Sequence, residues 1–351
     1  MKTFGRYLLY RLENSALRTV IFTIISVIIT QNTISDCIDH GAVEYNSTGI
    51  YILATILGII CTVIPILETM CFKNRRNLDT LYFFPIKRWK MATVHFLSGF
   101  IQILFIYSVT FFIAFGYLAA NTDYFALGYM PLYYLFSILI GFVMYSFFSF
   151  IFGQANTVAD GVVMCILWMF VLSIVSAVIT GKVVIPYLAA KDRESVIDLS
   201  GWGIAYAPIN NLTVIFQNLI EINKDAFDYN YQATYAARYM SQMYMFFVWG
   251  AIGIASAVGY VVAFVKKGAE KAGEISSSIF GYKLLIPLYG YSLLILFDWL
   301  ELFDSLDFMV VLIFIAMVIG YIIYRRSFRI KASDLIFTGC GVIAMILGAM
   351  F

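Results

Sequence analysis

The side chains best placed to contact another molecule lie in a basic and aromatic window, residues 73–90, between two apolar stretches. Six of the 23 Lys and Arg residues of the chain fall in this window: Lys73, Arg75, Arg76, Lys87, Arg88 and Lys90. Apolar and aromatic side chains lie between them: Leu78, Leu81, Tyr82, Phe83 and Phe84. Arginine and aromatic side chains are enriched at the energetic centres of protein interfaces, whereas clustered cations also bind lipid head groups. The window therefore predicts a binding surface, either for a groove on a protein or for lipid.

Pro85 divides this window into two predicted helical pieces, because proline inside a helix removes a backbone hydrogen bond and kinks or ends the helix. The segment before it, residues 77–84, contains Asn77 and Asp79 and predicts a short helix parallel to the membrane surface. The segment after it, residues 87–90, leads into the next apolar stretch. The aromatic residues of the first segment suit a plug that enters a groove on a cytoplasmic partner.

Common catalytic and nucleotide-binding motifs do not occur in the sequence. The pattern G-x-x-x-x-G-K-[ST] is missing, as are H-E-x-x-H and G-x-S-x-G. The five cysteines have neither metal-ligand nor disulfide spacing, and His40 and His95 are far apart. We therefore expect that this chain is not an enzyme and that it binds no metal or cofactor.

The composition is that of an all-α integral membrane protein. The chain of 351 residues is 62% hydrophobic and 13% charged, whereas soluble domains carry about 25% charged residues. Helices are the usual way to satisfy backbone polar groups within a bilayer. The net charge is only +2, and the basic residues cluster between apolar runs rather than over one face, so nucleic acid is not an expected partner.

Eight apolar runs approach the roughly 20 residues that a transmembrane helix needs, which predicts a polytopic bundle of about eight spans. The runs are residues 17–35, 49–71, 94–119, 131–152, 161–180, 243–265, 279–297 and 308–324. A ninth apolar run, residues 336–351, is shorter and would be an incomplete span, a re-entrant segment or the first part of a longer helix.

The loops between these runs differ sharply in charge. With this segmentation, 18 of the 23 Lys and Arg residues lie on one side, and 14 of the 21 Asp and Glu residues lie on the other. Because basic residues are retained on the cytoplasmic side, we predict a cytoplasmic N-terminus. The first 16 residues show helical periodicity of leucines, which predicts an amphipathic helix on the inner membrane surface; the alternative is the charged start of the first span.

Two carboxylates lie near the ends of predicted spans. Glu68 is near the inner end of the second run, and Asp160 opens the fifth, close to Gln154 and Asn156. We expect structural roles for both, including pairing with Lys73, Arg75 or Arg76. No acidic residue lies deep in a span, which argues against an ion-coupled transporter or an intramembrane enzyme.

One loop is much longer than the others. Residues 181–242 are predicted on the outside, and loops of this length are usually functional or have structure of their own. We interpret the loop as short helices on or in the outer leaflet, and residues 229–244 as a helix running into the sixth span. The loop also supports an alternative function: a membrane sensor or assembly protein that does not transport and that uses residues 181–242 to bind a ligand or partner.

The window resembles the loop after the second span of ABC-2-type ABC transporter permeases. Five residues match the pattern of that loop in order: Arg76, Asp79, Tyr82, Pro85 and Arg88. The stretch KKGAEKAGE, residues 266–274, is similar to the basic stretch after the sixth span of the same family. The likeness covers residues 1 to about 275.

The resemblance implies the membrane-spanning subunit of an ATP-driven exporter in the bacterial plasma membrane. Such permeases pair with a second permease chain, as homo- or heterodimers, and with cytoplasmic ATPase subunits that bind ATP and Mg²⁺; membrane lipids surround them. Their cargo includes peptides, antibiotics and lipid-like molecules. A coupling helix, here about residues 77–84, would enter a cleft on the ATPase, flanked by Arg75, Arg76, Lys87 and Arg88.

A second, smaller cytoplasmic contact would come from residues 153–160, with Gln154, Asn156 and Asp160. We thus divide the chain into the surface helix 1–16, a six-span permease core 17–275 and additional C-terminal spans 276–351. The usual family member stops after six spans, whereas some long members carry further spans and then an external domain. The apolar run 336–351 raises the expectation that this chain is the membrane part of such a longer protein.

Overall fold

The structure is a computed structural model, and it describes residues 2–39, 48–74, 86–121, 128–179, 229–268, 278–299 and 306–325 together with single positions at 273, 274, 276, 332, 334, 336, 338 and 339. The described part of the chain is helical and contains no strand. Its long helices are α1 (Lys2–Asp39), α3 (Thr48–Thr69), α5 (Arg88–Asn121), α6 (Met130–Gln154), α7 (Val158–Ile179), α10 (Tyr229–Lys266), α11 (Leu284–Trp299) and α12 (Leu306–Arg325). Two short turns, η1 (Met70–Lys73) and η6 (Ile279–Lys283), follow α3 and precede α11.

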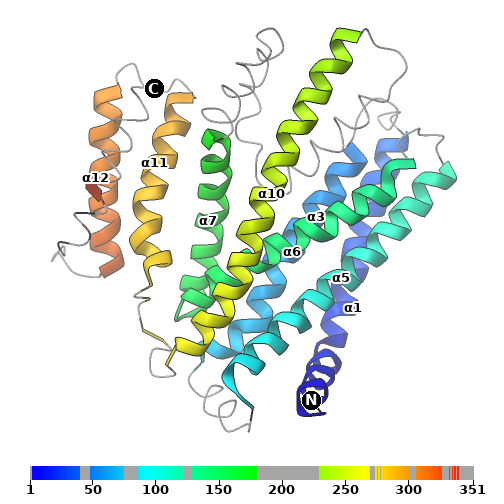
Figure 1. Ribbon diagram of the computed structural model, residues 1–351, viewed down its shortest axis with the longest axis horizontal. Coiled ribbons are helices and arrows are strands. Elements are labelled where there is room, and N and C mark those ends of the chain that lie inside the picture. The colour runs from blue at the N-terminus through cyan, green and yellow to red at the C-terminus, as the bar shows by residue number, and fades with distance from the viewer. Residues whose placement is uncertain are drawn as a thin grey trace.

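The helices run side by side, with α1 and α5 at one edge of the bundle and α12 at the other (Figure 1). Helix α6 is central, because it packs against α3, α5, α7 and α10. Helices α11 and α12 pack on each other, and α11 joins them to the rest through α7. The N-terminus, the start of α5, the turn between α6 and α7 and the end of α10 lie at the lower end in Figure 1. We call this lower end the basic end, because α1 and α5 begin there, with Arg6, Arg88 and Lys90 near their starts, and α10 ends there at Lys266 (Figure 1).

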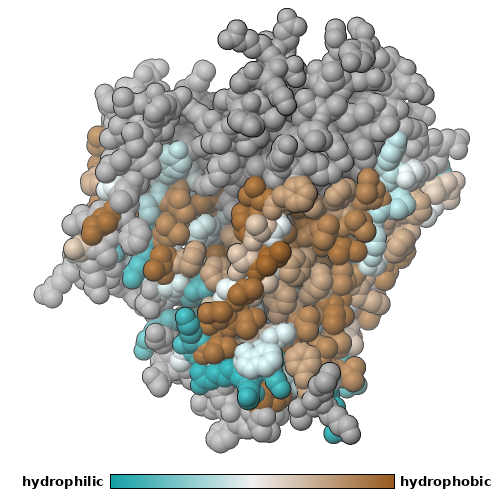
Figure 2. Space-filling model, viewed as in Figure 1, coloured by the Kyte–Doolittle hydropathy of each residue, from teal (hydrophilic) through white to brown (hydrophobic). Residues whose placement is uncertain are grey.

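The chain is a helical membrane-spanning protein. In the described part, five segments are long and apolar enough to cross a bilayer: Phe4–Ile38, Ile52–Lys73, Arg88–Asn121, Met130–Gln154 and Phe246–Lys266. Helices α7, α11 and α12 coincide with three more of the predicted apolar runs, so the total of about eight spans stays a prediction. The run 336–351 lies almost entirely outside the described residues. Figure 2 shows a broad apolar band over the described surface, with hydrophilic residues gathered at the basic end.

Helix α1 turns its polar side toward the bundle and its apolar side outward. Hydroxyl side chains are buried along its inner face: Ser15, Thr19, Thr23, Ser26 and Thr30. Aliphatic side chains are exposed along its outer face: Leu17, Ile21, Ile24, Ile25 and Ile28. Small hydroxyl residues allow close approach of helices in lipid and bond across them, as the hydroxyl groups of Ser26 and Thr110 do at 2.7 Å. This is the pattern of a helix whose outer face meets lipid.

The first 16 residues continue into the first apolar run without a break, since α1 is one helix of 38 residues. This continuity agrees with the alternative interpretation, in which they are the charged start of the first span; their position on the membrane surface stays a prediction. Helix α10 confirms the expected helix that runs from residue 229 into the sixth span. The rest of the long loop, residues 180–228, lies outside the described residues.

Candidate functional site

The predicted coupling window divides into a part that the structure describes and a part that it does not. Most of its predicted site residues lie outside the described residues: Arg75, Arg76, Asn77, Asp79, Leu81, Tyr82, Phe83, Phe84 and Pro85. Its flanks, residues 73–74 and 86–90, are described, as is the second predicted contact, residues 153–160. The candidate site is therefore built from these flanks and from the groups that hold them.

The two flanks meet in one apolar cluster at the basic end. Phe72 and Ile86 both pack against buried Met91 and Val94 of α5 and Tyr7 of α1. The Phe72 ring also lies edge-on to the Phe264 ring of α10, with centroids 4.7 Å apart. The two flanks of the window therefore meet at one place, where α1, α5 and α10 come together.

Lys73 ties the first flank to the end of α6. Its side chain is buried, and its Nζ donates to the carbonyl oxygens of Phe152, at 2.7 Å, and Ala155, and more weakly to that of Gly153, at 3.4 Å. The last carbonyls of a helix lack helical partners and carry its negative dipole end, so a cation is favourable there. This contact could not be predicted from the sequence, because Lys73 and its acceptors are some 80 residues apart and no local pattern links them.

The same carbonyls accept a second cation, Lys267, which follows the end of α10. Its Nζ donates to the carbonyl oxygens of Gly153, at 3.0 Å, and of Ala155. Arg88, which is exposed on the second flank, contacts the Lys267 carbonyl at 3.5 Å. The structure thus joins both flanks of the window to the α6–α7 turn, and two lysines make the direct connection.

The polar groups of the second predicted contact are held from within the chain. The Gln154 side-chain oxygen accepts from Ser278 Oγ at 2.7 Å, and the Gln154 carbonyl accepts from Ser276 Oγ at 2.8 Å. Asn156 is 4% exposed, and its carbonyl accepts from the backbone N–H of Gly273 at 3.1 Å. The segment 273–282 therefore braces this turn, while its predicted contact with a partner subunit stays a prediction.

Glu68 is the centre of a buried polar cluster between α1, α3 and α5. The carboxylate is fully buried and accepts from Arg11 Nη2 at 2.7 Å, from Arg18 Nη2 and from Gln102 Nε2 at 2.7 Å. His95 lies on its other side, with Nδ1 3.2 Å from the Glu68 carbonyl oxygen and Nε2 3.0 Å from the Tyr7 hydroxyl.

These partners correct the predicted pairing of Glu68 with Lys73, whereas the alternatives Arg75 and Arg76 lie outside the described residues. Within the described residues its ion pairs are with Arg11 and Arg18, not with Lys73, which binds the α6 carbonyls instead. Arg11 and Arg18 are seven positions apart, which is close to two helical turns, so both project from one face of α1. A buried carboxylate is tolerated only when it is paired and hydrogen-bonded, and these contacts fasten α1 to α3 and α5.

No described group of three or more His, Cys, Asp or Glu side chains could hold a metal ion. Comparison with protein-family models gives no match, and no curated protein matches the chain either. The fold and the polar basic end define a membrane-spanning helical protein with a loop anchored on one end of its bundle.

Proposed function

We propose that the chain is the membrane-spanning permease subunit of an ATP-driven exporter of the ABC-2 type. In this proposal it lies in a bacterial plasma membrane with its N-terminus in the cytoplasm, and it pairs with a second permease chain. Separate cytoplasmic ATPase subunits bind ATP and Mg²⁺, and the cargo is a peptide, an antibiotic or a lipid-like molecule. The observation that carries the proposal is the bonding of Lys73 to the end of α6, which links the two predicted ATPase contacts.

The anchoring suits a loop that must pass force to the helices. A displacement of residues 75–85 acts on Phe72 and Lys73 at one flank and on Ile86 at the other. From there it reaches α6 through the carbonyls that Lys73 holds, and α1 through Tyr7. Packed helices respond to such a load by shifting as units rather than by local deformation. A loop that only bound lipid would not need this connection.

The strength of the Lys73 contact supports the same role. Pulling Lys73 away would leave its buried Nζ without the carbonyl acceptors, and an unsatisfied buried polar group costs about 1–3 kcal/mol or more. The junction is therefore stiff, and movement at the window is transmitted to the bundle instead of being absorbed at the flank.

The proposal is tested by association with the ATPase that the neighbouring gene is expected to encode. The double variant Asp79→Lys with Tyr82→Ala should abolish co-elution of the chain with that ATPase and its effect on ATP turnover. A matched control is Tyr10→Ala with Glu13→Lys, since both residues are exposed near the start of α1, at the basic end of the bundle. Unchanged complex formation by the window variant, with the control also unchanged, would rule out the coupling role.

The sidedness of the window gives a second test. A cysteine introduced at Tyr82 should react with a membrane-impermeant thiol reagent only in inside-out vesicles. Labelling of the same position in intact cells would place the window on the exterior and overturn the proposal, whatever the outcome of the association measurement.

A further inference from the structure

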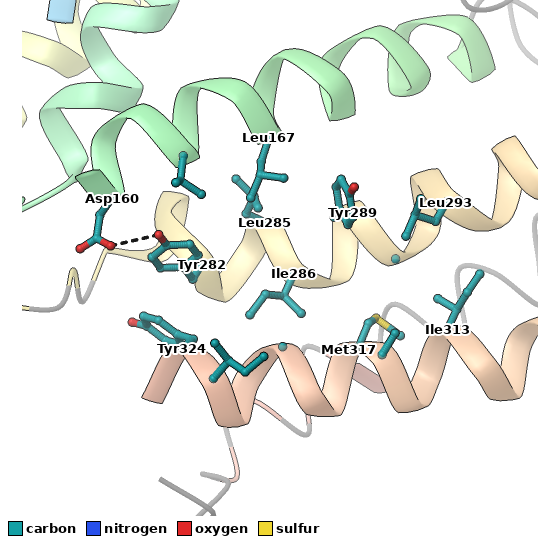
Figure 3. A pocket seen from close by; sticks show the side chains of 15 residues that line it. Asp160, Leu167, Tyr282, Leu285, Ile286, Tyr289, Leu293, Ile313, Met317 and Tyr324 are labelled. Atoms are coloured by element: carbon teal, nitrogen blue, oxygen red, sulfur yellow. Dashed lines mark hydrogen bonds between the residues drawn. The ribbon is translucent and has the colours of Figure 1, made fainter. Parts of the chain in front are cut away.

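A cavity of about 570 Å³ lies between α7, α11 and α12, the last two of which lie beyond the six-span core (Figure 3). Its lining is mainly apolar, with polar groups at one end. The lining side chains labelled in Figure 3 are Asp160, Leu167, Tyr282, Leu285, Ile286, Tyr289, Leu293, Ile313, Met317 and Tyr324. The volume lies within the range of roughly 300–1,000 Å³ typical of small-molecule sites.

The two ends of the cavity differ in chemistry. Asp160, Tyr282 and Tyr324 lie together at the end nearest the α6–α7 turn, whereas Leu293 and Ile313 lie at the far end (Figure 3). From Tyr282 to Leu293 the chain advances roughly 16 Å, because a helix rises about 1.5 Å per residue. A ligand that fills this space therefore has a polar head and an elongated apolar body.

Asp160 gives the polar end its charge. Its carboxylate accepts one described hydrogen bond, from the Tyr282 hydroxyl at 3.1 Å, and its backbone N–H donates to Thr157 Oγ1 at 3.1 Å. Among the residues that the structure describes, no basic side chain forms an ion pair with it. The carboxylate also lies in the first turn of α7, whose positive dipole end stabilises it. A single hydrogen bond from a neutral donor leaves it acceptor capacity for a cation.

Tyrosine rings beside Asp160 suit a cationic head rather than a neutral one. The rings of Tyr282 and Tyr324 have centroids 5.0 Å apart and planes inclined by 43°. Hydrogen bonds fix both rings, because Tyr282 donates to Asp160 and Tyr324 donates to the Ser276 carbonyl at 2.5 Å. Aromatic faces attract cations, and quaternary ammonium groups are bound by such combinations of rings.

The apolar part of the cavity is shaped by close packing of α11 on α12. A side chain at Gly290 would meet Met317 Cγ and Sδ at 2.8 Å, and one at Gly320 would meet Ile286 at 3.4 Å. These glycines let α11 and α12 pack closely along one wall of the cavity, which we call the slot. Its apolar lining suits an alkyl chain.

We propose that this slot binds a cationic amphiphile, with its ammonium head between Asp160, Tyr282 and Tyr324 and its apolar chain along α11 toward Leu293. The inference concerns binding alone and does not depend on the proposed role as an exporter subunit. Within that role, the ligand would be cargo or an effector of this chain.

The test uses the full chain in nanodiscs of zwitterionic lipid, with dodecyltrimethylammonium as the probe. A photoreactive analogue with a diazirine at the end of its alkyl chain should label the far end of the slot, at Leu293 or Ile313. Unlabelled dodecyltrimethylammonium should compete for this labelling, and dodecanol, which has the same chain and no charge, should compete at least tenfold less well.

Asp160→Asn should weaken competition by the cation about tenfold or more, since it removes the charge and keeps an oxygen that can accept from Tyr282. Glu13→Gln is the matched control, because it removes an exposed carboxylate at the same end of the bundle and should change nothing. Ala316→Phe should block labelling by filling the slot, whereas Ile315→Phe, on the same helix but outside the lining, should not.

Two results would overturn the inference. One is equal competition by dodecanol and the cation, which would show that the charge of the head is not recognised. The other is an Asp160→Asn variant that binds the cation within twofold of the wild type. Asp160→Asn preserves the shape of the site, so it gives an answer even where Ala316→Phe disturbs folding.

Discussion

Glu68 and Asp160 are carboxylates at the same end of the bundle, and their surroundings are opposite. Glu68 is fully buried and held by two arginines and a glutamine, with a histidine beside it. Asp160 is half-buried and accepts a single described hydrogen bond, from Tyr282. The first is a buried cluster that joins helices, whereas the second lines one end of a cavity.

Glu68 and Asp160 differ in the number of partners that the charge already has. A charge with several partners suits a structural role, and a charge with few partners suits a binding role. At Glu68, two guanidinium groups face one carboxylate that already accepts three described hydrogen bonds, so an added cation would meet repulsion. At Asp160, an approaching cation would find a carboxylate with unused acceptor capacity. Exchanging each acid for its amide is therefore the sharpest way to compare the two regions.

Glu68→Gln should have the largest effect on stability, a loss of about 3 kcal/mol, because removing one member of a buried ion pair leaves the other charges uncompensated. The measurement is the temperature at which a thiol-reactive dye labels the buried Cys61 and Cys165 as the purified chain is heated. Glu13→Gln serves as the exposed control. An unchanged labelling temperature in Glu68→Gln would show that the cluster does not hold the helices together.

Lys73→Met should have the next largest effect, a loss of about 1–3 kcal/mol, since the carbonyls at the end of α6 lose a buried donor. If the proposed function holds, this variant should still co-elute with the ATPase while its coupled ATP turnover falls. Lys87→Met, at an exposed position of the other flank, should change stability by no more than about 0.5 kcal/mol. Equal losses of stability in Lys73→Met and Lys87→Met would show that Lys73 anchors the flank no more than an exposed lysine does.

Asp160→Asn should change stability least, by no more than about 0.5 kcal/mol, because Asp160 is half-buried outside any buried ion pair and Asn keeps an oxygen that accepts from Tyr282. The same dye-labelling measurement tests this expectation. A loss of stability as large as that of Glu68→Gln would mean that Asp160 stabilises the fold as strongly as Glu68 does, and would contradict the contrast between the two carboxylates.

The positions of the helices could be predicted from the sequence because they depend on long apolar runs, which are a local property. Each of the eight predicted runs overlaps a described helix. Helix boundaries were less predictable, since α5 begins at Arg88, six positions before the run that marked it. Its first two turns place Met91 and Val94 in the apolar cluster that the flanks of the window share, which hydropathy alone does not report.

The partners of Glu68 could not be predicted because they depend on how α1 crosses α3 and α5. Arg11 and Arg18 are 57 and 50 positions away from Glu68 in sequence. A usable signal was present in α1, where Ser and Thr residues recur on the face that carries both arginines. In water such a polar face points outward. In lipid the preference is reversed, so polar periodicity within an apolar run marks the packed side.

The short turn between α6 and α7 is held by hydrogen bonds from two sides. Lys73 and Lys267 hold its carbonyls from the side of the window, and Ser276, Ser278 and Tyr282 hold its polar groups from the side of α11. The same few turn residues thus bond both to the flank of the window and to the stretch that leads into α11. A shift of either segment changes the contacts that the turn offers to the other, and thermodynamic linkage requires that this influence be mutual.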